Sequence, residues 1–124
     1  AHLAEASDIL LCMLPGGEGT RNAINADILK KLGPTGIFIN VGRGSSVDEA
    51  ALAAALQKQH IFAAGLDVYS DEPNVPEELL EQDNVVLLPH IGSATVETRK
   101  AMGQLVIDNL DAYFSGKPLL TEVS

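Results

Sequence analysis

The chain has 124 residues, of which 46% are hydrophobic but only 4% aromatic, and it carries a formal net charge of −9. This length suits one domain with a single core, and the aliphatic, tryptophan-free composition suits parallel strands packed against helices. The acidic balance and the scattered Lys and Arg argue against a nucleic-acid partner, because binding to phosphate backbones needs clustered cations.

The single cysteine, Cys12, lies in an apolar run, so the sequence predicts neither an internal disulfide nor a multi-cysteine metal site. A charged-then-apolar leader and an apolar run of about 18 residues are both missing, so we expect no signal peptide, no membrane span and a cytoplasmic setting. Residues 1–6 resemble the last turn of a helix whose beginning is missing. They predict that the sequence is a truncated part of a longer chain.

Four apolar runs predict four strands, over residues 8–14, 36–41, 62–68 and 85–88. The first run, DILLCML, shows no polar alternation, which is typical of a strand covered on both faces. Helix signals separate most of these runs. They predict helices from Asn25 to Leu32, from a Ser46–Glu49 capping box to about Gln59, shortly after Pro76, and from Ser93 or Thr95 to about Ser115.

The last helix has apolar residues at steps of three and four, which predicts one buried face made of Met102, Leu105, Val106, Leu110 and Tyr113. The alternation of strands and helices predicts a mostly parallel sheet with right-handed crossovers. In such a sheet, ligands bind outside the carboxyl ends of the strands.

Four reactive side chains lie at or just after the ends of predicted strands. Arg43 stands between two glycines and has the geometry to grip a carboxylate at two points; the alternative is a surface arginine on a turn. His90 can give and take a proton near neutral pH, or simply bond a nearby carbonyl. A carboxylate behind an imidazole orients it, which suggests a role for Glu72 or Asp67, although Glu72 also fits a solvated acid.

Other chemistries lack a motif. The segment PGGEGT has neither the GxGxxG spacing nor the Gly-Lys-Ser/Thr of a phosphate loop. The sequence contains no GxSxG turn of a serine hydrolase and no His/Cys/Asp cluster with metal-ligand spacing.

Four segments in order, ASDILLCMLPGGEGTRNAIN, INVGRGSSVDEAAL, AAGLDVYSDEP and LLPHIGSATVETR, resemble the C-terminal part of the D-isomer-specific 2-hydroxyacid dehydrogenases, the family of the glyoxylate/hydroxypyruvate reductases. The resemblance implies an α/β fold, the second half of a Rossmann-type doubly wound parallel sheet whose first βαβ unit is missing. It also implies NAD- or NADP-linked interconversion of a small 2-oxo acid and its D-2-hydroxy acid. Which acid, and which of the two cofactors, stays open.

The resemblance also implies roles for single residues. Arg43 would hold the substrate carboxylate, His90 would act as acid and base, and Glu72 would hydrogen-bond His90. Cofactor contacts are implied for Pro15, Thr20, Val41, Gly42, Arg43, Asp67, His90, Gly92 and Ser93. No metal is implied.

The family's GxGxxG loop and substrate domain have no counterpart here, and Gly16-Gly17 replace its usual Thr/Ser-rich turn. We therefore expect residues 1–93 to be the C-terminal part of a dinucleotide-binding domain, and residues 94–124 a helix and tail that return to a substrate domain. A part of a dehydrogenase, inactive alone, is the leading hypothesis. A stand-alone binding module that reuses half a Rossmann fold is the second.

A signalling receiver domain fits poorly, because no paired acids follow the first strand.

In the usual strand order, residues 8–14 would pair with the missing first strand. An apolar, unpaired edge invites strand addition, so we expect a homodimer or other self-association through this edge.

Overall fold

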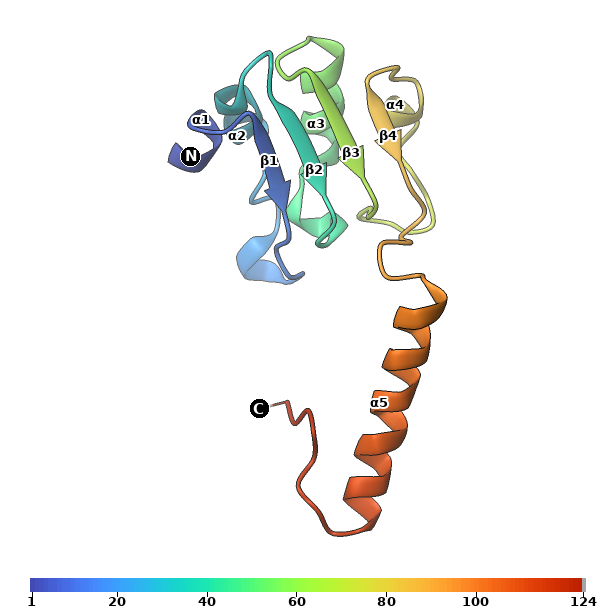
Figure 1. Cartoon of the computed structure of the whole chain (residues 1–124). Helices are drawn as coiled ribbons and strands as arrows, with labels where there is room; N and C mark the ends of the chain where they lie inside the picture. Colours follow the sequence, from blue (N-terminus) through green and yellow to red (C-terminus); the bar gives the residue numbers. More distant parts are fainter. Residues whose placement is uncertain (124) are drawn as a thin grey trace. The chain divides into compact units, whose positions relative to one another are not determined.

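The computed structural model describes residues 1–123, and the chain divides into two compact units, Ala1–His90 and Ile91–Ser124. The first unit is an α/β fold with one sheet and one layer of helices (Figure 1). Its parallel strands follow one another in the order β1 (Ile9–Cys12), β2 (Ile37–Asn40), β3 (Ala63–Leu66) and β4 (Val85–Leu87). Its helices are α1 (His2–Glu5), α2 (Ala26–Leu32), α3 (Glu49–Gln57) and α4 (Glu77–Leu80), with 3-10 turns at Glu18–Thr20 and Gly44–Ser46. The predicted parallel α/β sheet is confirmed.

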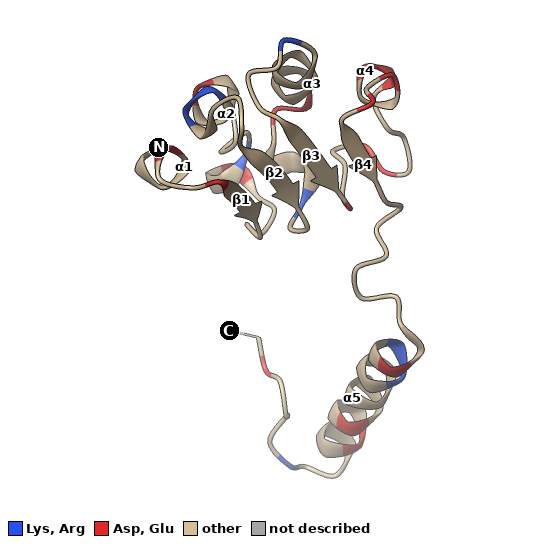
Figure 2. Ribbon diagram, turned by 45° about the horizontal axis from the view of Figure 1, so that its top comes forward, with Lys and Arg blue, Asp and Glu red and all other residues tan. Residues whose placement is uncertain are grey.

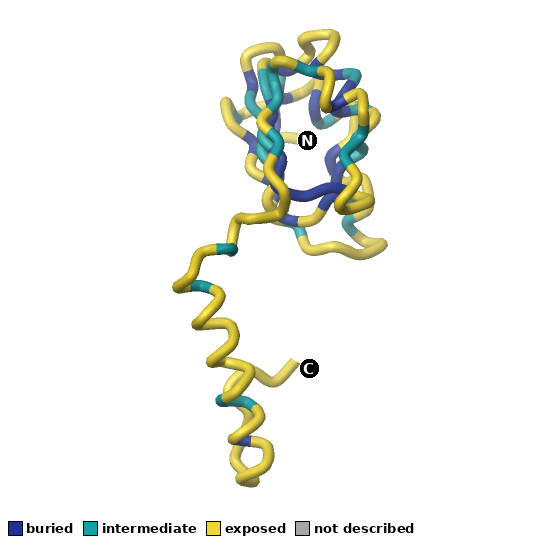
Figure 3. The backbone as a smooth tube through the Cα atoms, turned by 90° about the vertical axis from the view of Figure 1, so that its right-hand side faces the viewer, coloured by how far each residue is buried: buried dark blue, intermediate teal, exposed yellow. Residues whose placement is uncertain are grey.

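The core of the first unit lies between the sheet and its helices, as the two facing rows of buried residues in Figure 3 show. Alternate strand residues point into it, so Phe38 is fully buried and Leu66 is 3% exposed. They meet helix residues such as Leu29 and Leu52, which are also fully buried. The strands contain no charged residue, and the charged residues lie on helices and loops (Figure 2).

The other face of the sheet is open and apolar. The exposed fractions of Ile9, Leu11 and Val86 are 56%, 52% and 62%. The prediction that the first strand is covered on both faces is therefore wrong for this chain. An unbroken apolar run shows that both faces avoid polar residues, but it does not show which part of the chain covers them. Strand β1 has only β2 as a neighbour, so it forms an edge, as expected.

The helix caps agree with the sequence at one helix and differ at another. The Asn25 side chain accepts hydrogen bonds from the N–H groups of Asp27 and Ile28 at the start of α2, as predicted. The predicted Ser46–Glu49 capping box is wrong. Asp48 caps α3 by accepting from Ala51, because the Ser46 hydroxyl is buried and donates elsewhere.

The second unit contains α5 (Val96–Phe114), which Thr95 caps by accepting from the Thr98 N–H at 3.2 Å. Its apolar residues are exposed in this chain, Met102 by 57% and Val106 by 60%, so the predicted buried face is not buried here. The Asn109 side chain binds the tail, which returns along the helix to Thr121. Within residues 1–123, no helix has both the length and the hydropathy needed to cross a membrane.

Candidate active site

The carboxyl ends of the four strands meet at one edge of the sheet, and the loops with the predicted site residues leave from that edge. Parallel pairing continues one residue beyond β2, β3 and β4. The N–H groups of Val41, Asp67 and Leu88 donate to the preceding strand's carbonyls at 3.1, 3.0 and 2.8 Å. This shared register brings residues that are far apart in the sequence to the same edge.

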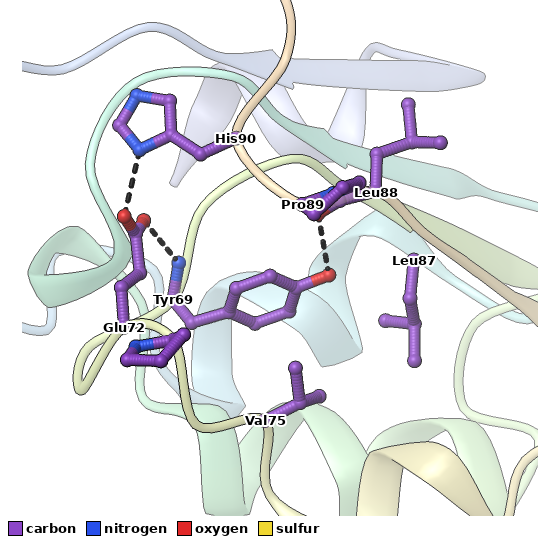
Figure 4. A pocket seen from close by; sticks show the side chains of 8 residues that line it. Tyr69, Glu72, Val75, Leu87, Leu88, Pro89 and His90 are labelled. Carbon is purple, nitrogen blue, oxygen red and sulfur yellow. Dashed lines mark hydrogen bonds and ion pairs between the residues drawn. The ribbon is translucent and has the colours of Figure 1, made fainter.

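His90 and Glu72 form a hydrogen-bonded pair at this edge. The His90 Nδ1 lies 2.7 Å from Glu72 Oε2, and the side chains are 46% and 35% exposed. The second carboxylate oxygen accepts a hydrogen bond of 3.0 Å from the Tyr69 N–H. Figure 4 shows that the other ring nitrogen of His90, Nε2, points away from Glu72. The pair thus orients the ring and leaves Nε2 on the side away from Glu72.

The surroundings of Glu72 keep it ionised. The hydrogen bond from His90 does most to hold the pKa of this carboxyl below its usual value of 4.5, followed by the hydrogen bond from the Tyr69 N–H. The positive charges of His90 and Arg43 lower the pKa further, whereas partial burial opposes them. Glu72 is therefore a carboxylate at neutral pH, and its contact with Nδ1 orients the His90 ring.

Arg43 leaves from a tightly packed turn after β2. A Cβ added at Gly42 would lie 2.6 Å from the Leu14 carbonyl oxygen, and one added at Gly44 would lie 1.9 Å from the Tyr69 carbonyl carbon. Neither position has room for a side chain, so the backbone passes between the residues that follow β1 and β3. The Arg43 guanidinium donates to the Gly42 carbonyl at 2.7 Å, and the residue as a whole is exposed.

The loop after β1 lies against the Arg43 stem. A Cβ added at Gly16 would lie 3.4 Å from Arg43 Cγ. The Thr20 hydroxyl donates to the Pro15 carbonyl at 2.7 Å, which closes this loop. Two residues of the predicted cofactor set therefore contact each other directly, beside the turn that carries Arg43.

The other residues predicted to contact the cofactor lie partly in the first unit and partly in the second. Val41 is exposed, Gly42 is buried, and Asp67 follows β3 with 5% of its surface exposed. Gly92 and Ser93 belong to the second unit, so their part in a cofactor site stays a prediction.

Residues 1–92 match the family model described as the NAD-binding domain of D-isomer-specific 2-hydroxyacid dehydrogenases. The chain belongs to this family. It is 54% identical over 122 residues to a hydroxyphenylpyruvate reductase of Plectranthus scutellarioides and 53% identical over 121 residues to a glyoxylate/hydroxypyruvate reductase of Arabidopsis thaliana. Both alignments cover 98% of this chain and 39% of the relative.

Solved structures agree with this assignment. An NADPH-dependent glyoxylate/hydroxypyruvate reductase from Sinorhizobium meliloti, in complex with NADP and malonate, superimposes with a TM-score of 0.95 at 58% identity. That match covers 99% of this chain and 39% of the solved one. The chain thus spans about two fifths of the length of the dehydrogenases it matches.

The 2-hydroxyacid dehydrogenase loops fit part of a dinucleotide. The loop after β1 has open space along its glycines, because a Cβ at Gly17 or Gly19 would meet nothing within 4 Å. Open glycine backbone allows a ligand to approach closely. Val41 and Asp67 lie at the carboxyl ends of β2 and β3, at the same edge of the sheet as this loop, which is the edge where a nicotinamide cofactor would bind.

An apolar cavity of about 230 Å³ lies on the Nδ1 side of His90 in this dehydrogenase domain (Figure 4). It is lined by Tyr69, Glu72, Pro73, Val75, Leu87, Leu88, Pro89 and His90. Burial raises the pKa of the Tyr69 hydroxyl above its usual 10.0, and the charge of Asp67 adds to this effect. The hydroxyl therefore stays protonated and donates to the Leu88 carbonyl at 2.9 Å.

Sequence reasoning missed three residues that shape the site. Tyr69 joins the Glu72 loop to the segment before His90 through its N–H and its hydroxyl. Asn40 and Ser46 hold the turn that carries Arg43. The available signal was a polar Asn at the end of the apolar run IFIN, since a buried polar side chain requires a partner.

Proposed function

We propose that this chain supplies the carboxylate-binding and acid–base residues of an NAD(P)-dependent reductase that converts a 2-oxo acid to a D-2-hydroxy acid. The observation that carries the proposal is the His90–Glu72 pair, 2.7 Å apart at the strand ends, with the positive charge of Arg43 acting on the same carboxylate. The family assignment supports it. The relatives named above are reductases, which favours an enzyme over a stand-alone binding module.

The proposed mechanism gives each residue one task. Arg43 binds the substrate carboxylate through its guanidinium and places the neighbouring carbonyl near His90. Protonated His90 donates the Nε2 proton to the carbonyl oxygen as that oxygen gains negative charge. Glu72 orients the ring and stabilises the imidazolium. In the reverse direction, neutral His90 removes the hydroxyl proton. The bound cofactor supplies or accepts the hydride.

A substitution at His90 tests this proposal. In the complete gene product, His90→Gln removes the transferable proton, so we expect kcat for reduction of glyoxylate or hydroxypyruvate to fall about 10²- to 10⁴-fold. Initial rates follow from the absorbance of the reduced nicotinamide, and circular dichroism checks the fold. Retention of wild-type kcat would exclude His90 as the acid. A wild-type protein that reduces no 2-oxo acid with either cofactor would exclude the function itself.

We also propose that Pro15, Thr20, Val41, Gly42, Arg43, Asp67, His90, Gly92 and Ser93 contact the cofactor. The GxGxxG loop is not among the 124 residues, and the chain covers about two fifths of its relatives. We therefore expect the 124-residue chain alone to bind neither NADH nor NADPH in calorimetric titration and to lack activity. The complete gene product is the positive control. Micromolar binding by the chain alone would contradict this expectation.

The proposal also covers the substrates, the substrate domain and the cellular location of the enzyme. Its substrates would be small 2-oxo acids of the kind named for the relatives, and residues 94–124 would return to a substrate domain. The single, buried cysteine supports a reducing, cytoplasmic setting.

Self-association through β1 is supported by its position at the edge and by the exposed Leu11. We expect Leu11→Lys to lower the weight-average mass of the chain in light scattering. A monodisperse monomer before the substitution would refute self-association.

A further inference from the structure

Asn40 is a buried polar residue at the carboxyl end of strand β2, which lies between β1 and β3. It is 1% exposed and follows Ile37, Phe38 and Ile39 in β2. Its backbone lies between Cys12 of β1 and Leu66 of β3 in the parallel register, so its position is fixed from both sides. A buried amide is costly unless its donors and acceptors are bonded.

Both ends of the Asn40 amide bind the turn that carries Arg43. The Asn40 Oδ1 accepts from the Gly42 N–H at 3.1 Å, and Nδ2 donates to the Arg43 carbonyl at 3.2 Å. Ser46, which is fully buried, donates its hydroxyl to the same carbonyl at 2.6 Å and its N–H at 3.2 Å. The Arg43 carbonyl therefore accepts three hydrogen bonds from the interior.

The turn has little freedom to compensate for a lost hydrogen bond. Gly42 is packed against the Leu14 backbone and Gly44 against the Tyr69 backbone, with no room for a Cβ at either position. The Cys12 thiol lies 3.4 Å from the Ser46 hydroxyl and closes the buried side. The Arg43 side chain leaves outward from a backbone that is fixed on all these sides.

We propose that Asn40, with Ser46, is a positioning residue for substrate binding: it fixes the Arg43 peptide so that the guanidinium meets the substrate carboxylate. The proposal rests on the proposed function, since it assigns that carboxylate to Arg43. Asn40 acts on the binding of the 2-oxo acid and leaves proton transfer by the His90–Glu72 pair unchanged, because it forms no hydrogen bond with that pair.

Asn40→Leu tests the proposal in the complete gene product, because leucine keeps the branched shape and removes both hydrogen bonds. We expect faster amide hydrogen exchange in peptides covering residues 41–46. We also expect an increase of about 10-fold in KM for the 2-oxo acid, which is ~1.4 kcal/mol. The pH dependence of kcat should not move. Ser46→Ala, which introduces no bulk, should act in the same direction by a few-fold.

Asn84→Leu is the matched control. Its amide bonds the Phe62 carbonyl at 3.1 Å at the amino ends of the strands, so this variant should change thermal stability but neither KM nor the exchange of residues 41–46. Unchanged exchange in both Asn40→Leu and Ser46→Ala would overturn the proposal whether or not the protein is active. Faster exchange with an unchanged KM would also overturn it. A wild-type protein without reductase activity would refute the proposed function and, with it, the link to substrate, while exchange still reports whether Asn40 holds the turn.

Discussion

Replacing Glu72 by glutamine should slow the reaction without removing the fold. The Glu72 carboxylate contacts the His90 Nδ1 at 2.7 Å, and glutamine keeps the size of the side chain while removing its charge. The ring loses the charged partner that holds it in place and stabilises the imidazolium. Proton transfer through Nε2 should therefore be slower in both directions, reduction and oxidation.

The size of this effect follows from the geometry and exposure of the pair. A hydrogen bond between charged groups contributes about 1.5–3 kcal/mol when water is excluded. Here the His90 and Glu72 side chains are 46% and 35% exposed, so solvent screening reduces the value to about 1 kcal/mol. Since about 1.4 kcal/mol corresponds to a tenfold change in rate, kcat should fall by roughly 5-fold in both directions.

The assay measures kcat for reduction and oxidation across pH in the complete gene product, with Glu78→Gln as the control. Glu78 is an exposed acid on α4, and the structure shows no ion pair between its carboxylate and any described residue. A general change in surface charge would move the control by the same amount. If kcat of Glu72→Gln equals that of the wild type in both directions, the pair does not support proton transfer by His90 and the reasoning fails.

Three further predictions use stability and binding. Because the pKa of Glu72 lies below 4.5, its contribution to the free energy of unfolding is present above that pH and is lost as the pH falls through the lowered pKa. In urea denaturation, the free energy of unfolding of Glu72→Gln should therefore fall less steeply than that of the wild type as the pH is lowered below 4.5. Identical dependences on pH would refute this. Arg43→Lys removes the two-point grip, so KM for the 2-oxo acid should rise by about 10-fold or more in initial-rate measurements, and an unchanged KM would exclude Arg43 from substrate binding. Gly44→Ala places a Cβ 1.9 Å from the Tyr69 backbone and should lower the free energy of unfolding, measured with urea, by about 1–3 kcal/mol. Gly103→Ala, with nothing within 4 Å, should not destabilise α5, and equal effects of the two substitutions would refute the packing argument.

The sequence was sufficient to predict the parallel sheet, because each strand is an apolar run that ends in a glycine, a proline or a charged residue. It also located the cap of α2, since the Asn25 side chain acts on the adjacent N–H groups. It failed at α3, where Ser46 and Asp48 compete as caps. The Ser46 hydroxyl is used by the Arg43 carbonyl, and a sequence pattern does not show which of several acceptors a hydroxyl will choose.

The sequence predicts which residues gather in the candidate site, but not which residues hold them in place. Arg43, Glu72 and His90 each follow a strand, so parallel pairing alone predicts that they gather at one edge. The side chains of Asn40 and Tyr69 bond backbone carbonyl and N–H groups, which nearly every residue offers. Such contacts depend on three-dimensional placement and leave no residue pair in the sequence to detect.

The proposed catalytic groups are held in two different ways, and this difference separates their expected phenotypes. Arg43 stands on a backbone fixed by buried contacts, so changes beneath it should alter how the substrate binds. His90 is oriented by a half-exposed hydrogen bond with Glu72, so changes there should alter how fast the proton is transferred. A variant of Asn40 that lowers only kcat, or a variant of Glu72 that changes only KM, would show that the two supports act as one.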